Sequence, residues 1–183
     1  MSFENFVKRA LLALSDAGLE YVIIGGFVVI AYGRLRSTAD LDVVINIKPS
    51  EKESIAKLVS AFKKHGLDVL ENEIVSSLKE RSHFSVFDTK SPLRVDAKGV
   101  YTRLDSKALE NRRKTKLLGL NGWAASPEDT IIAKLIYGSP QDIEDAMSIM
   151  LSLRNKIDFK YLNQRAEQEN VQEQLKELLG KLK

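Results

Sequence analysis

Apolar and polar residues alternate along this chain with two periods, and the period changes with position. Apolar side chains recur every three to four residues between Phe3 and Leu14, which predicts an amphipathic helix that stops at Gly18. Ser50 and Glu53 form a capping-box signature for a later helix. We expect strands at 21–24, 41–47, 68–70, 84–87 and 93–97, helices at 27–32, 50–65 and 73–79, and a hairpin of 116–120 with 123–124 across Asn121-Gly122.

The last third of the chain has a helical pattern. Ser126-Pro127 supplies an N-cap and a first-turn proline, and the helical spacing then continues to the end with breaks at 138–140 and near Asp158. We therefore predict an α/β fold of the α+β kind, in which helices flank a mixed sheet. The predicted division is a sheet domain at 1–125 and a C-terminal helical region at 126–183 that packs on it.

Two carboxylates stand in the second predicted strand. Asp40 and Asp42 point to the same face because successive strand side chains alternate, whereas Leu41 and Val43 point to the opposite face. Aspartate is depleted in strands, and an unpaired buried charge costs roughly several kcal/mol. The alternative is an edge strand with solvated aspartates, but the neighbouring β-branched residues favour burial. The pair therefore predicts a site for a divalent cation.

The donor set favours Mg²⁺, with Mn²⁺ as an alternative, because carboxylates are hard oxygen ligands and the chain has no cysteine and two histidines. Asp96 is the best candidate for a third carboxylate, since it stands in a strand where Val95 and Ala97 face away from it. Its structural alternative is an ion pair with Arg94 or Lys98. Asp88 and Asp105, which stand in turn-like contexts, are weaker alternatives for the third carboxylate.

Gly25-Gly26 ends the first predicted strand. Glycines at such a place let the backbone turn sharply and present its N–H groups to an anion, although a glycine pair is more often only a turn. What raises its interest is the Asp40-x-Asp42 strand that follows.

Taken together, these motifs resemble the nucleotidyltransferase superfamily whose palm domain is shared with DNA polymerase beta. The nearest resemblance is to small prokaryotic members related to abortive-infection toxin nucleotidyltransferases. The residues that carry it are Gly25-Gly26, Arg36-x-Thr38-x-Asp40-x-Asp42 and Asp96, followed by a helix opening in Pro127-Glu128-Asp129, then Lys134, and then Asp142 with Asp145.

The resemblance implies a nucleotidyltransferase palm in which Asp40, Asp42 and Asp96 hold two magnesium ions under a nucleoside triphosphate, ATP among the candidates. Asp96 also helps to deprotonate the acceptor hydroxyl. A nucleoside monophosphate passes to the acceptor, and pyrophosphate leaves. The implied nucleotide-binding residues are Gly25, Gly26, Arg36, Thr38 and Lys134. Arg36 has a structural alternative, an ion pair with Asp40 or Asp42, and Lys134 has one as a solvated helix residue.

Charge and composition bear on the partners and the location. The net charge is +3 and the basic run 112–116 is a candidate for steering RNA phosphates, so a tRNA end, a protein hydroxyl and a small-molecule hydroxyl all stay open as acceptors. The apolar stripe at 171–182 packs on the body or forms a partner or homodimer surface. With no cysteine, no span of about 20 apolar residues and no signal-like start, we expect a cytoplasmic protein without membrane contact.

Two other functions compete with the enzyme. One is a toxin–antitoxin or nucleotide-binding module that has kept the fold and little catalysis, with an antitoxin as its partner. The other is a glycosyltransferase that uses Asp40-x-Asp42 for a nucleotide sugar, although the chain is short for that class and its Gly25-Gly26 turn is then unexplained.

Overall fold

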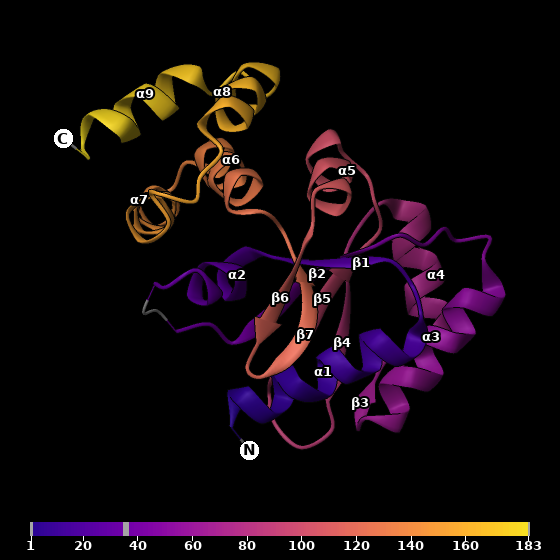
Figure 1. Cartoon of the computed structure of the whole chain (residues 1–183). Coiled ribbons are helices and arrows are strands. Elements are labelled where there is room, and N and C mark those ends of the chain that lie inside the picture. The colour runs from indigo at the N-terminus through magenta and orange to yellow at the C-terminus, as the bar shows by residue number, and fades with distance from the viewer. Residues whose placement is uncertain (1, 35–36, 183) are drawn as a thin grey trace.

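The computed structural model describes residues 2–34 and 37–182, and within them the centre is a seven-stranded mixed sheet (Figure 1). The strand order is β3-β4-β5-β2-β1-β7-β6. β2 runs antiparallel to β1 and parallel to β5, so the strand with two predicted carboxylates lies in the middle of the sheet. The strands are β1 (Tyr21–Ile24), β2 (Asp40–Ile45), β3 (Leu67–Asp68), β4 (Phe84–Asp88), β5 (Arg94–Lys98), β6 (Arg113–Leu117) and β7 (Leu120–Ala124).

The larger apolar core lies on one face of this sheet. It is formed with α1 (Phe3–Ala17), α3 (Lys52–Lys64) and α4 (Glu71–Glu80), and it takes Leu41 and Val43 from β2. Because side chains alternate along a strand, Asp40 and Asp42 face the other way. That second face meets α2 (Gly25–Ala31) and α5 (Arg103–Glu110).

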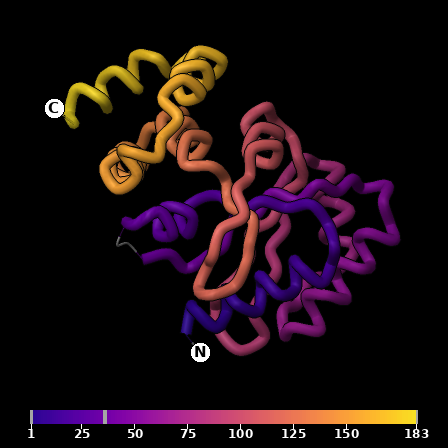
Figure 2. The backbone as a smooth tube through the Cα atoms, viewed as in Figure 1, coloured from indigo at the N-terminus to yellow at the C-terminus, as the bar shows by residue number. Residues whose placement is uncertain are grey.

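A second apolar cluster joins the C-terminal helices α6 (Pro127–Tyr137), α7 (Pro140–Ser152), α8 (Phe159–Gln168) and α9 (Gln172–Gly180). Figure 2 shows this group on the opposite side of the molecule from α1. Leu175 and Leu178 of the predicted apolar stripe are buried in this cluster together with residues of α6, α7 and α8. Val29 of α2 joins the same cluster, and the proposed boundary after residue 125 stays a prediction. No helix in the described part of the chain is long and apolar enough to cross a membrane.

The predicted hairpin is right in kind but wrong in its turn. Leu118 and Gly119, with φ of 52° and 86°, form the connection between β6 and β7. Asn121 and Gly122 lie inside β7 instead. A Cβ atom at Gly122 would come within 3.0 Å of Leu11, so this glycine permits close packing of α1 against the hairpin.

Two further differences concern helix starts. The Ser50 capping box is wrong, because α3 begins at Lys52 after Glu51, which makes no side-chain capping bond. Helix α5 has no counterpart in the predicted elements. Thr102 and Asp105 form a true capping box at its start, a signal that the sequence did contain.

Candidate functional site

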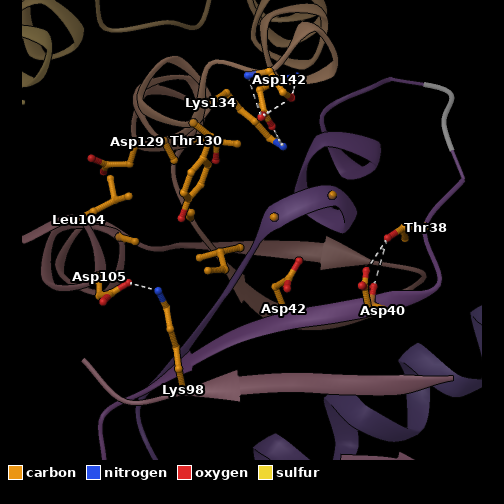
Figure 3. Close-up of a pocket in the computed structure, with 18 of the residues that line it drawn as sticks. Thr38, Asp40, Asp42, Lys98, Leu104, Asp105, Asp129, Thr130, Lys134 and Asp142 are labelled. Atoms are coloured by element: carbon orange, nitrogen blue, oxygen red, sulfur yellow. Dashed lines mark hydrogen bonds and ion pairs between the residues drawn. The ribbon is translucent and has the colours of Figure 1, made fainter. Parts of the chain in front are cut away.

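Three carboxylates lie on one face of two neighbouring strands. In the parallel pairing of β2 with β5, Asp42 is the register partner of Asp96, and Asp40 is the partner of Arg94. Asp40 and Asp42 line a cavity of about 430 Å³ between the sheet and helices α5, α6 and α7 (Figure 3). The fold therefore brings the predicted pair to a concave site.

The pKa of Asp42 is strongly raised by its surroundings. Burial, and then the charges of Asp40 and Asp96, raise its pKa to about 6, while Lys134 and Lys98 act in the opposite direction. Mutual repulsion of this kind is relieved by a cation, and a set of carboxylate oxygens suits a hard divalent ion. The residues present therefore fit Mg²⁺ or Mn²⁺.

The backbone at residue 25 passes so close to Asp42 that only glycine fits there. Its φ is +70°, and a Cβ atom there would lie 2.0 Å from Asp42 Oδ2. Only glycine combines this backbone conformation with this contact. Gly25 opens α2 directly after β1, and both Gly25 and Gly26 line the cavity. Their predicted contact with phosphate stays a prediction.

Asp96 has protein partners in this structure. The Nε of Arg94 donates to both of its oxygens, at 2.9 and 2.8 Å, and Ser85 Oγ donates to Oδ1 at 2.6 Å. The pairing with Arg94 is the alternative that the sequence left open. Asp40 in turn accepts from Thr38 Oγ1 at 2.9 Å.

Consistent with these separate contacts, no three His, Cys, Asp or Glu side chains of the described residues are grouped so that they could hold a metal ion. Asp96 shares the face of Asp40 and Asp42 through the strand register, but it is not among the residues that line the cavity. A three-carboxylate site therefore requires Asp96 to exchange Arg94 for the cation.

The opposite wall of the cavity carries Lys134 of α6. Its ammonium contacts Asp142 at 2.7 Å and Asp145 at 2.9 Å, and its side chain is only 11% exposed. It is therefore a buried residue, and the alternative of a solvated helix lysine is wrong. Arg36, the remaining predicted phosphate ligand, lies outside the described residues.

The structure places further residues at the cavity, among them Lys98, named above only as a possible partner of Asp96, and Asp105, named only as a weaker alternative to Asp96. Lys98 and Asp105 form an ion pair of 2.8 Å at one end, and exposed His83 lies at the same cavity. Lys98 follows Asp96 by two positions in one strand, so the shared face was a signal available in the sequence. Apolar lining comes from α5 and α6 through Leu104 and Ala133 among others.

Comparison with known proteins assigns this arrangement to a class. The model of a family described as "Nucleotidyltransferase of unknown function (DUF6036)" matches residues 3–179. The match places the chain in the class of nucleotidyltransferase families. The chain belongs to the DUF6036 family, whose substrate its description leaves open. No protein among the curated sequences matches the chain.

Solved structures share the fold. The crystal structure of ANT(2")-Ia in complex with adenylyl-2"-tobramycin has 17% identity and a TM-score of 0.61, over 91% of this chain and 96% of that one. A solution structure of the same antibiotic-resistance factor has 16% identity and a TM-score of 0.57, over 98% and 94%. An antigenic nucleotidyltransferase-like protein from Paracoccidioides brasiliensis has 16% identity and a TM-score of 0.56, over 97% and 92%.

At these identities, the solved structures show the fold alone and confirm the mixed α/β architecture with its C-terminal helices. The narrower resemblance to abortive-infection toxin nucleotidyltransferases is not shown by these matches and stays a prediction, as do an antitoxin partner and a homodimer.

Proposed function

We propose that this protein transfers a nucleoside monophosphate from a nucleoside triphosphate to an acceptor hydroxyl, with release of pyrophosphate. The observation that supports this most strongly is the set of three same-face aspartates on adjacent strands, with Gly25 in contact with Asp42. Such a set of hard oxygen donors, two of which line the cavity, suits two-metal phosphoryl transfer.

In this proposal Asp40 and Asp42 hold Mg²⁺ or Mn²⁺, and Asp96 completes the site once Arg94 has released it. The metal supplies charge stabilisation for the phosphoryl group and its leaving group. Asp96 accepts the proton of the attacking hydroxyl, and Thr38 orients Asp40 through its 2.9 Å hydrogen bond. Lys134 contacts the triphosphate from the opposite wall of the cavity.

The cavity offers room for the donor nucleotide. Its volume of about 430 Å³ lies in the range of small-molecule sites. Besides its carboxylates, the lining includes apolar surface from Leu104, Ala108 and Ala133. We assign the apolar part to the nucleobase, with ATP as one of four triphosphates to be compared.

We further propose a small-molecule hydroxyl as the acceptor. The basic run at 112–116, the sequence feature that favoured RNA, is partly neutralised: Arg112 pairs with Glu20, and Arg113 pairs with buried Glu128. It also belongs mostly to β6, at the sheet edge, with β1 and β7 between it and β2. The adenylylated tobramycin in the complex of the similar fold is a small molecule as well.

The test uses each of the four α-³²P-labelled triphosphates with Mg²⁺ and three acceptor pools: hydroxyl-bearing small molecules that include aminoglycosides, tRNA, and protein. We expect label in the small-molecule pool together with pyrophosphate release. Asp42→Asn should reduce transfer by roughly 100-fold or more, because a metal ligand is lost. Asp68→Asn is the matched control, since Asp68 is an exposed strand aspartate outside the cavity.

Other outcomes would redirect the proposal. Label on tRNA or protein would overturn the small-molecule acceptor while supporting the transferase. Metal-dependent nucleotide binding without transfer to any pool would favour the nucleotide-binding module. Transfer of the sugar from a labelled nucleotide sugar would favour the glycosyltransferase.

A further inference from the structure

Lys98 is a partly buried lysine at the cavity to which the chemistry above gives no role. It lies on β5 two residues after Asp96, on the same face, and its side chain is 12% exposed. A lysine ammonium loses hydration when it is buried, so its position calls for compensating partners. Its ion pair with Asp105, at 2.8 Å, supplies one of them.

The ammonium of Lys98 keeps donor capacity for a ligand. It has three N–H donors, and Asp105 is its one ion-pair partner among the residues that the structure describes. Lys134, by contrast, contacts two carboxylates. Lys98 is therefore the less saturated of the two cavity lysines.

Asp105 does not depend on Lys98 for its hydrogen bonds. Its Oδ2 accepts from the backbone N–H groups of Tyr101 and Thr102, at 3.1 and 2.9 Å, as part of the capping box of α5. These bonds stay in place if Lys98 swings away. An exchange of Asp105 for another anion therefore leaves the start of α5 intact.

The two lysines lie on different walls of the cavity around Asp42. In Figure 3, Lys98 and Asp105 lie to one side of Asp42, Thr38 and Asp40 lie to the other, and Lys134 with Asp142 lies above. Both lysines lower the pKa of Asp42 against the effect of burial, so both charges act on the carboxylate cluster. Phosphates bound over that cluster would lie between two cations.

We propose that Lys98 is a second phosphate-binding lysine of this site. Its ammonium moves away from Asp105 and contacts the triphosphate chain of the donor, and later the pyrophosphate that is released. The proposal rests on the proposed nucleotidyl transfer. It makes Asp105 a competitor of the ligand, because the carboxylate and the phosphates share the same ammonium.

Isothermal titration of inorganic tripolyphosphate with Mg²⁺ tests this, since the probe has no base, sugar or transferable group. We expect Lys98→Met to weaken its binding by about 10- to 100-fold, the usual size for a hydrogen bond to a charged group. Lys98→Arg should keep most of the affinity. Lys116→Met, at an exposed lysine of β6, is the matched control and should leave it unchanged.

Asp105→Asn provides the decisive variant, because the amide oxygen still accepts from the backbone while the competing charge is gone. We expect it to tighten tripolyphosphate binding several-fold, whereas Lys98→Met/Asp105→Asn should bind as weakly as Lys98→Met. Thermal unfolding of each variant checks that it is folded. If Lys98→Met fails to fold, two comparisons still decide: Asp105→Asn against the wild type, and Lys98→Arg/Asp105→Asn against Lys98→Arg. Both should show tighter binding, and weaker or unchanged binding in both would overturn the proposal.

The proposal is overturned if Lys98→Met and Asp105→Asn weaken binding alike, or if neither changes it, because Lys98 would then only support Asp105. Nucleotidyl transfer measured separately tells the two proposals apart. If the wild-type protein transfers nucleotide while Lys98→Met binds tripolyphosphate normally, only the proposal for Lys98 is overturned. A wild-type protein that binds neither nucleotide nor tripolyphosphate overturns both.

Discussion

The carboxylates on the two sides of the cavity have opposite surroundings. On the helical side, Asp129 and Asp145 are fully buried, and each pairs with a cation: Arg165 for Asp129 and Lys134 for Asp145. On the sheet side, Asp42 has carboxylates as close neighbours and no ion-pair partner within the described ranges 2–34 and 37–182. The buried carboxylates Asp129 and Asp145 are therefore compensated as folded, whereas Asp42 lacks the positive charge that a ligand would bring.

Asp129 shows how complete the helical side is. It lines the cavity, yet its carboxylate accepts from Arg165 Nε at 3.0 Å, from Tyr161 at 3.0 Å and from Ser126 at 2.9 Å. These partners join the start of α6 to α8. A residue whose oxygens are used in this way holds helices together, so its place in the cavity lining does not make it a ligand-binding group.

The largest expected change in stability comes from breaking the ion pair between Arg165 and Asp129. Arg165→Met leaves the buried Asp129 without its cation, and the loss of one member of a buried pair costs about 3–5 kcal/mol. Urea unfolding measures the change in free energy. Lys176→Met is the control, since Lys176 forms an exposed pair with Glu173 that contributes about 0–1 kcal/mol. A loss below about 1 kcal/mol for Arg165→Met would show that the helical side is not held by this pair.

On the sheet side, removal of a charge is expected to raise the stability of the protein. Asp42→Asn should stabilise the metal-free protein at pH 7.5, because it removes a buried charge repelled by Asp40 and Asp96 and only partly offset by Lys98 and Lys134. A pKa raised from 3.8 to about 6 corresponds to at most about 3 kcal/mol. Thermal unfolding without metal measures the gain, and exposed Asp68→Asn should give none.

The gain has a defined pH dependence. The folded pKa of Asp42 lies above its unfolded value, so the penalty on the wild type is absent below pH 3.8, grows as the pH rises to about 6, and is complete above that. The stabilising effect of Asp42→Asn should therefore vanish near pH 4. A gain that is equal at pH 4 and pH 7.5 would mean that repulsion around Asp42 is not its source.

The sequence predicted the sheet side better than the helical side, and the reason is physical. Asp40 and Asp42 contrast with a β-branched run within one strand, and a period of two places their side chains on one face without any knowledge of the fold. The compensation of Asp129 depends on Arg165, which is 36 positions away in the chain. Local patterns do not encode such pairings.

The same limit explains the errors and omissions nearer the site. Asn121-Gly122 has a strong local turn propensity, but Gly122 is needed where α1 packs against β7, so tertiary packing overrode it. Asp105 was predicted to lie in a turn, although its capping box with Thr102 is a local signal; only its ion pair with Lys98 depends on the fold. The choice between Arg94 and a metal as the partner of Asp96 cannot be read from spacing, because both use the same carboxylate.

The smallest expected effect concerns Arg94, the cation that gives one sheet-side carboxylate a partner. Its side chain is 46% exposed, so its pair with Asp96 contributes about 0–1 kcal/mol. Because the cation no longer has to displace this partner, Arg94→Ala should bind Mn²⁺ up to about fivefold more tightly. Titration of Mn²⁺ into nucleotide-free protein, followed by electron paramagnetic resonance, measures it. Arg103→Ala is the control, because Arg103 donates to the Gln168 carbonyl and is not among the residues that line the cavity.

An unchanged or weaker Mn²⁺ affinity in Arg94→Ala would show that Arg94 does not compete for Asp96, and would weaken the contrast between the two sides of the cavity. A gain would show that Arg94 and the cation compete for the same carboxylate. The buried pair Arg165–Asp129 resists release because its release would leave a charge without water, whereas the half-exposed Arg94 stays solvated when it lets go. A partner is then exchangeable where water solvates the released cation, as for Arg94, or where an anionic ligand replaces the lost carboxylate, as proposed for Lys98 and Lys134.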